Sequence, residues 1–125
     1  MVRAGVIGLG FMGQQHSKCY QGNADVELVA ICDVDEKKFA GDATRGNIDD
    51  GGEELDLTKV NTYTDADEMF AKENLDAVSI TLPTSMHKEY TVKALEAGIN
   101  VMCEKPMAMD LAECDDMMAA QKKTS

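Results

Sequence analysis

Short apolar runs alternate with segments of helical periodicity along the whole chain. Runs dense in apolar residues are typical of strands that are buried on both faces of a parallel sheet. The predicted strands cover residues 2–7, 26–31, 57–60, 75–82 and 99–103, of which 57–60 has the weakest pattern. The predicted helices cover residues 11–21, 35–44, 65–73, 85–97 and 110–123. This alternation predicts an α/β fold: a doubly wound parallel Rossmann sheet of about five strands with helices on both faces.

Residues at the helix ends support these boundaries. Thr64 can cap the helix that starts at residue 65, and Gly98 follows a helix end in the position where a left-handed conformation favours glycine. Asp110 and Glu113 form a predicted capping box at the start of the last helix. Residues 46–56 have five carboxylates and no apolar period, which predicts a surface loop.

A glycine-rich turn, Gly8-Leu9-Gly10-Phe11-Met12-Gly13, joins the first strand to the first helix. One glycine allows a tight turn, one lets the backbone approach a pyrophosphate, and one lets the helix pack close to the strand. The unpaired N–H groups of the helix N-terminus attract anions. We therefore expect Gly8, Gly10, Phe11, Met12 and Gly13 to bind the diphosphate of a dinucleotide.

An acidic residue, Asp33, stands 20 positions beyond Gly13, at the end of the second apolar run. A carboxylate there can accept hydrogen bonds from both hydroxyls of an adenosine ribose, and it repels the 2′-phosphate of NADP. Residues 34–36 contain no arginine that would neutralise it, so the sequence predicts NAD, with NADP less favoured. Lys37 and Lys38 are the opposing feature, because either could reach a phosphate.

Length and charge predict a single domain and argue against nucleic-acid-binding and membrane proteins. A chain of 125 residues makes one domain, 1–125, large enough to bury a core. Its net charge of −11 repels nucleic acids and anionic lipids, and no stretch approaches the ~20 apolar residues that span a bilayer. The four cysteines lack metal-ligand spacing, so we expect reduced thiols and no metal site. A soluble, cytoplasmic protein without nucleic-acid or membrane partners is expected.

Two later segments add a second set of candidate residues. Thr81-Leu82-Pro83 precedes His87, and Cys103-Glu104-Lys105-Pro106 ends the fifth predicted strand. Both lie where a strand ends at the ligand edge of the sheet. Together with the glycine motif they resemble the glucose-fructose oxidoreductase, inositol dehydrogenase and MocA family (Gfo/Idh/MocA), from Met1 to about Met118.

The resemblance implies an NAD(P)-dependent dehydrogenase that acts on CH–OH groups of sugars, inositols or related polyols. By position, Lys105 would be the catalytic lysine beside the nicotinamide, where an ammonium can polarise a carbonyl and assist proton movement. Glu104 would lie near the nicotinamide, and Pro106 would fix the turn. Thr81, Leu82, Pro83 and His87 would line the cofactor edge.

Structural roles without a part in catalysis or cofactor binding remain possible for Lys105, His87 and a further residue, His16. Lys105 could end a strand at a solvated edge, and His87 could be a surface histidine in a first helical turn. His16, on the first helix, is expected to be a packed or capping residue rather than a catalytic one.

Members of the family are usually more than twice this length and continue into a substrate domain. The chain is therefore expected to be a cofactor domain that binds NAD but turns over little substrate alone, with an exposed apolar face that could form a homo-oligomer. Two alternatives remain: the cofactor domain of an NAD-dependent glycoside hydrolase, and a stand-alone dinucleotide-binding module without catalysis. A methyltransferase would explain neither the Glu104-Lys105-Pro106 segment nor the order of strands after Asp33, and the chain is too short for a flavoprotein fold.

Overall fold

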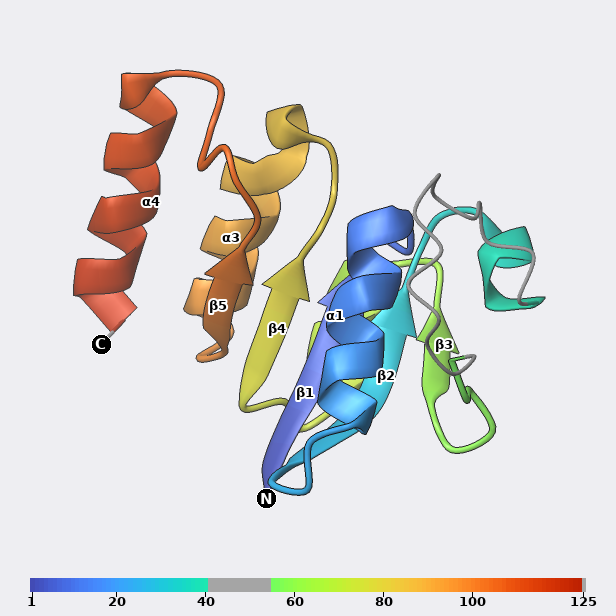
Figure 1. Cartoon of the computed structure of the whole chain (residues 1–125). Coiled ribbons are helices and arrows are strands. Elements are labelled where there is room, and N and C mark those ends of the chain that lie inside the picture. The colour runs from blue at the N-terminus through green and yellow to red at the C-terminus, as the bar shows by residue number, and fades with distance from the viewer. Residues whose placement is uncertain (41–54, 125) are drawn as a thin grey trace.

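The computed structural model describes residues 1–40 and 55–124 of the chain (Figure 1). The strands are β1 (Val2–Ile7), β2 (Val26–Cys32), β3 (Asn61–Tyr63), β4 (Ala77–Ile80) and β5 (Asn100–Cys103). The α-helices are α1 (Phe11–Gln21), α2 (Ala66–Lys72), α3 (His87–Glu96) and α4 (Leu111–Thr124). Two 3₁₀ helices, η1 (Glu36–Ala40) and η2 (Thr84–Met86), follow the ends of β2 and β4.

The five strands form one sheet in the order β3-β2-β1-β4-β5, and every neighbouring pair is parallel. The chain runs outward from β1 to β3 and then crosses to β4 on the other side of β1. This reversal makes the gap beyond the carboxyl ends of β1 and β4 a topological switch point, where open α/β sheets bind ligands. The predicted doubly wound Rossmann sheet is confirmed.

Apolar side chains fill both faces of the sheet. On the face covered by α1 the buried cluster consists of Val6, Leu9, Leu28 and Ile31, with Tyr20 of α1 packed against it. On the face covered by α2 and α3 it consists of Ile7, Val29, Ala30, Cys32, Ala66, Met69, Leu75, Val78, Ile80, Ala94 and Ile99. Each fully buried aliphatic side chain stabilises the fold by about 1.5–3 kcal/mol, so one cluster fixes α1 and the other fixes α2 and α3 against the sheet.

The β5 side of the molecule is less completely covered. Helix α4 packs along α3, beyond β5, and Met117 is its buried residue (Figure 1). Five large apolar side chains of this region are exposed: Met102, Met107, Met109, Leu111 and Met118.

The thiol of Cys32 is buried at the end of β2. Desolvation raises its pKa to about 12, with the negative charges of Asp33 and Asp65 adding to the effect. Cys32 is therefore a protonated, packed side chain, and all four cysteines are free, as expected.

The prediction of a third strand over residues 57–60 was wrong. The strand is Asn61–Tyr63, whereas Leu57 and Val60 close a turn through a Val60 N–H bond to the Leu57 carbonyl. Both side chains pack against the apolar cluster under α1. The apolar residues that suggested a strand thus serve a packed turn, and the strand itself is polar because it lies at the sheet edge.

Other boundaries moved by a few residues. Helix α2 is capped by Asp65, which accepts a hydrogen bond from the Asp67 N–H at 2.9 Å, rather than by Thr64. Strand β4 is shorter than the predicted 75–82. Of the predicted helix 35–44 the structure has η1, and residues 41–44 lie outside the described part of the chain, as does most of the predicted loop 46–56.

Two predicted helix ends are confirmed. Gly98 has a φ of +79° after α3, the left-handed conformation that favours glycine. At α4, Asp110 Oδ1 accepts the Glu113 N–H at 2.8 Å, and Glu113 Oε2 accepts the Met109 N–H at 3.0 Å. Within residues 1–40 and 55–124, no helix has the length and apolar character needed to cross a bilayer.

Candidate cofactor-binding site

Two glycines of the β1–α1 turn have no room for a side chain. A Cβ on Gly13 would lie 1.7 Å from the carbonyl oxygen of Gly8, so the first turn of α1 touches the end of β1 through backbone alone. Gly8 has a φ of +90°, and a Cβ there would lie 2.8 Å from the Thr81 carbonyl oxygen. Both glycines are therefore required by the fold itself.

The third glycine has open space around it. No atom lies within 4 Å of a Cβ built on Gly10, which is the N-cap of α1 with a φ of −68°. No side chain caps this helix, and no acidic residue lies in its first turn. The N–H groups near Phe11 and Met12 thus form an uncapped helix N-terminus beside free space, an arrangement that suits the diphosphate of a dinucleotide.

Asp33 joins the end of β2 to the glycine turn. Its Oδ2 accepts the Leu9 N–H at 2.8 Å, and its Oδ1 accepts the Asp35 N–H at 2.9 Å. The residue is 7% exposed, and Lys38 Nζ lies 3.6 Å from Oδ2. Each carboxylate oxygen retains a lone pair after these bonds, so Asp33 can still accept hydroxyl groups of a ribose. The bond to Leu9 was not foreseen from the sequence.

The segment after β4 is fastened to the same turn. Thr81 Oγ1 lies 2.9 Å from the carbonyl oxygen of Ile7 and 2.6 Å from that of Gly8, and its single hydroxyl hydrogen is shared between them. Leu82 packs against the buried cluster, and Pro83 is exposed at the start of η2. Thr81 therefore holds β4 against the glycine turn.

His87 connects the segments that follow β4 and β5. Its Nδ1 lies 2.8 Å from the carbonyl oxygen of Pro106, and its Nε2 lies 2.8 Å from that of Leu82. The residue is 1% exposed, so the idea of a surface histidine was wrong. Carbonyl oxygens only accept hydrogen bonds, so a neutral ring donates to one of the two and a charged ring donates to both, and the ring contacts both segments in either state.

Glu104 and Lys105 follow β5 directly. Glu104 Oε1 lies 3.0 Å from Nε2 of His16, and its Oε2 accepts the backbone N–H of Lys105 at 3.2 Å. The hydrogen bond from His16 is the main cause that lowers the pKa of Glu104, helped by the Lys105 N–H and by the charges of both residues. Glu104 is therefore ionised at neutral pH.

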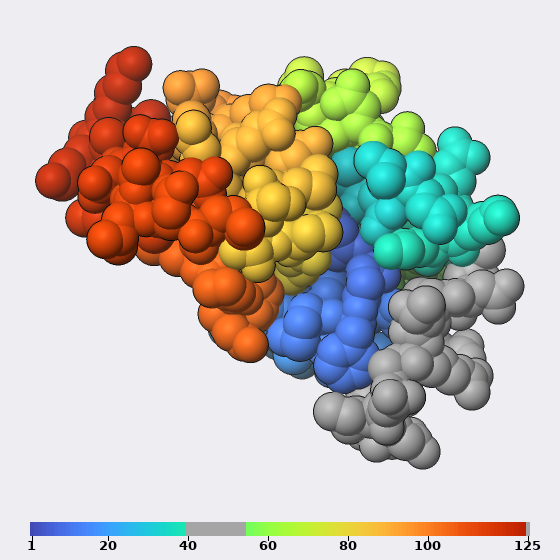
Figure 2. All heavy atoms as spheres, turned by 90° about the horizontal axis from the view of Figure 1, so that it is seen from above, coloured from blue at the N-terminus to red at the C-terminus, as the bar shows by residue number. Residues whose placement is uncertain are grey.

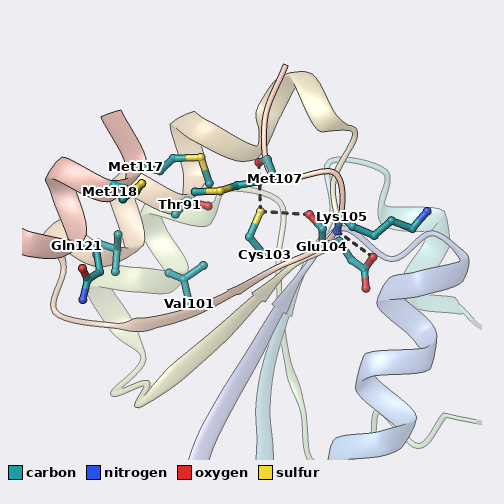
Figure 3. Close-up of a pocket in the computed structure, with 10 residues that line it drawn as sticks. Thr91, Val101, Cys103, Glu104, Lys105, Met107, Met117, Met118 and Gln121 are labelled. Atoms are coloured by element: carbon teal, nitrogen blue, oxygen red, sulfur yellow. Dashed lines mark hydrogen bonds between the residues drawn. The ribbon is translucent and has the colours of Figure 1, made fainter. Parts of the chain in front are cut away.

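A cavity of about 470 Å³ adjoins these residues, between α3, β5 and α4 (Figure 3). Its walls are mainly apolar and include Val101, Met107 and Met117. Figure 3 shows the Lys105 side chain extended, with its ammonium pointing away from this cavity. Glu104 and Lys105 nevertheless belong to its lining, so the cavity reaches the segment that follows β5.

The predicted site residues gather along one edge of the sheet. Seen from above, the glycine turn after β1, the segment after β4 and the segment after β5 lie next to one another (Figure 2). The hydrogen bonds of Asp33, Thr81 and His87 link these segments. Sequence reasoning missed the contact of His16 with Glu104, because it joins residues 88 positions apart.

Comparisons with known proteins agree with this geometry. A family model described as an oxidoreductase family with an NAD-binding Rossmann fold, GFO_IDH_MocA, matches residues 2–125. The chain is 31% identical over 113 residues to 2,7-anhydro-N-acetylneuraminate hydratase of Mediterraneibacter gnavus, covering 90% of this chain and 26% of that protein. It is 32% identical over 124 residues to inositol 2-dehydrogenase/D-chiro-inositol 3-dehydrogenase of Lactiplantibacillus plantarum, covering 98% and 33%.

A solved structure is similar over the same region. The WlbA dehydrogenase of Chromobacterium violaceum, in complex with NADH and UDP-GlcNAcA, superposes with a TM-score of 0.83 at 26% identity, covering 98% of this chain and 32% of that one. The chain thus spans about a third of the length of its relatives. It belongs to the Gfo/Idh/MocA family of oxidoreductases with an NAD-binding Rossmann fold, as the sequence motifs predicted.

Proposed function

We propose that residues 1–125 are the NAD-binding domain of a dehydrogenase that transfers a hydride between the nicotinamide and a CH–OH carbon of a sugar, inositol or related polyol. The observation that carries the proposal is the uncapped N-terminus of α1 beside the open space at Gly10, placed at the switch point of the sheet. A relative named as an inositol dehydrogenase supports the substrate class. Because the chain spans about a third of such relatives, the substrate pocket would come from residues outside it.

The cofactor would extend along the carboxyl edge of the sheet. Its diphosphate would accept hydrogen bonds from N–H groups at Gly10, Phe11 and Met12, in a turn shaped by Gly8 and Gly13. Asp33 would accept the ribose hydroxyls on the β2 side. Thr81, Leu82 and Pro83 would line the opposite side, towards the nicotinamide, and His87 would act by fixing the backbones at Leu82 and Pro106.

Lys105 is the proposed catalytic residue. When bound, NAD⁺ supplies the acceptor for the hydride that leaves the alcohol carbon. The ammonium of Lys105 would donate a hydrogen bond to the substrate oxygen, stabilise negative charge that develops on it, and help to move the hydroxyl proton. Glu104 would keep the neighbouring backbone in place, since His16 holds its Oε1 while its Oε2 accepts the Lys105 N–H.

One relative favours a second candidate function. The hydratase of Mediterraneibacter gnavus is named for a reaction that involves water and no net redox change. A cofactor domain like this one could therefore serve a hydratase, or the glycoside hydrolase considered above, through transient oxidation of a sugar. Net accumulation of NADH would identify a dehydrogenase, because neither the hydratase nor the glycoside hydrolase produces it. NAD binding without any turnover of substrate would instead favour the stand-alone dinucleotide-binding module.

Two glycine variants test the proposed cradle. Gly13→Ala forces a Cβ against the Gly8 carbonyl, and overpacking of this kind typically costs about 1–3 kcal/mol. The variant should therefore lower the free energy of unfolding by that amount or more. Gly10→Ala meets no atom and should cost less than about 1 kcal/mol in the free chain, yet lower NAD⁺ affinity by at least ~10-fold. Denaturant unfolding and calorimetry measure the two effects. Unchanged NAD⁺ affinity in Gly10→Ala would place the diphosphate elsewhere.

Asp33 should set the preference for NAD⁺. Its carboxylate would repel a 2′-phosphate, so NADP⁺ should bind at least ~10-fold more weakly than NAD⁺. In Asp33→Asn the preference should fall, because the negative charge is lost while an acceptor oxygen remains. Asp35→Asn is the matched control, since Asp35 is an exposed carboxylate two residues away. Equal dissociation constants for the two cofactors in the unaltered chain would contradict the assignment.

Lys105→Ala tests the catalytic role in the protein that carries this domain. With a panel of sugars and inositols, kcat should fall by about 10²–10⁴, while the Kd for NAD⁺ changes little. Lys88→Ala is the control, because Lys88 pairs with Asp116 at 3.1 Å and is not among the proposed cofactor-binding residues. Wild-type turnover in Lys105→Ala would refute the role.

Cytoplasmic location and self-association also belong to the proposal. The exposed apolar side chains of the β5–α4 side support a homo-oligomer formed by this face; they are Met102, Met107, Met109, Leu111 and Met118. Sedimentation equilibrium should therefore detect association of the chain at high concentration, and Leu111→Lys should weaken it. A strict monomer at all concentrations would rule the interface out.

A further inference from the structure

A row of four polar side chains runs across the buried interface between α1 and the sheet. Tyr20 Oη lies 2.6 Å from Ser79 Oγ, and Ser79 Oγ lies 2.9 Å from Nδ1 of His16. Nε2 of His16 lies 3.0 Å from Oε1 of Glu104. The row therefore begins on α1, crosses the middle of β4, returns to α1 and ends after β5.

These groups are largely withdrawn from water. Ser79 is fully buried in β4, and the side chains of His16 and Glu104 are 14% and 21% exposed. Polar groups in such places are costly unless they are hydrogen-bonded. Each of the four has a partner, so the row is a completed network rather than a chance contact.

The chemistry of the four groups determines which ring nitrogen of His16 donates a hydrogen bond. Glu104 is ionised, because its pKa is lowered, and an ionised carboxylate can only accept. Nε2 of His16 must therefore carry a hydrogen. When the ring is neutral, Nδ1 accepts from the Ser79 hydroxyl, whose oxygen accepts from Tyr20. When the ring is charged, Nδ1 donates to Ser79 instead, and in both states Nε2 donates to Glu104.

The far end of the row reaches the backbone of the proposed catalytic residue. Oε1 of Glu104 is held by His16, which leaves Oε2 directed at the Lys105 N–H, 3.2 Å away. The Lys105 side chain is exposed, so the position of its backbone decides where its ammonium can reach.

We propose that His16 is a positioning residue: through Glu104 it orients the backbone of Lys105, and it ties that orientation to α1, the helix proposed to bind the cofactor diphosphate. The importance for catalysis rests on the proposed function of Lys105. The existence of the contact network does not depend on that function. NMR of the chain tests the network, and kinetics of the protein that carries this domain tests the catalytic role.

The test uses the chain labelled with ¹³C and ¹⁵N, free and with NAD⁺. In the unaltered chain the ¹⁵N shifts of His16 should show a proton on Nε2. A neutral ring protonated on Nδ1 would overturn the proposal without any substitution.

Two substitutions of His16 separate its two contacts. Glutamine places an amide N–H near the position of Nε2 and can still donate to Glu104, whereas asparagine reaches only towards Ser79. His16→Gln should keep the lowered pKa of Glu104 and the Lys105 amide resonance. His16→Asn should raise the pKa of Glu104 and shift that resonance, although both variants alter the same packed position. Equal behaviour of the two variants would overturn the proposal.

Tyr20→Phe is the matched control at the other end of the row. It removes the Tyr20 hydroxyl but leaves Ser79 able to donate to His16, so Glu104 and Lys105 should behave as in the unaltered chain. If His16→Asn does not fold, the tautomer measurement on the unaltered chain still decides the matter.

Kinetics of the protein that carries this domain add the catalytic readout. His16→Asn should lower kcat by at least ~10-fold with a Kd for NAD⁺ within ~3-fold of the unaltered value, and His16→Gln should recover most of the loss. Full turnover in His16→Asn would refute the positioning role. Full turnover in Lys105→Ala would instead refute the proposed function, while the resonances of Glu104 would still report whether the network exists.

Discussion

The close approach of α1 to the end of β1 is the constraint on which the site depends. Gly13 packs against the Gly8 carbonyl so tightly that no side chain fits between them. This contact directs the N-terminus of α1 at the switch point between β1 and β4, and it brings the inner face of the helix onto the sheet. The polar network at the helix–sheet interface depends on this approach, and the helix end itself is uncapped because Gly10 has no side chain.

At the carboxyl edge of the sheet, polar side chains bonded to backbone add to the hydrogen bonds between the strands. Asp33 fastens β2 to the glycine turn, Thr81 fastens β4 to it, and His87 joins the segments after β4 and β5. Such bonds hold loops in place without filling the space above them with side chains. The edge can therefore be well defined while leaving room for a ligand.

The sequence predicted the features that depend on local chemistry. Apolar runs gave the strands, the glycine spacing gave the turn, and Gly98 and Asp110 marked helix ends because their roles are set by neighbouring residues. The third strand was misplaced because Leu57 and Val60 are apolar for packing against the α1-face cluster, whereas the polar strand Asn61–Tyr63 has no such pattern. Local pattern alone cannot distinguish an apolar turn from a short strand.

Long-range polar contacts were beyond sequence reasoning for a different reason. Ser79 stands within an apolar strand and His16 within a helix, and nothing in the spacing of either residue indicates a partner. Their meeting depends on the sheet order, which places β4 next to β1 and so beneath α1, and β5 next to β4. The same order that creates the ligand crevice therefore brings one helix into contact with both the glycine turn and Glu104. A Rossmann fold in this form connects the glycine turn with the segment after β5 through α1, since a shift of that helix would move the proposed diphosphate site and the backbone of Lys105 together.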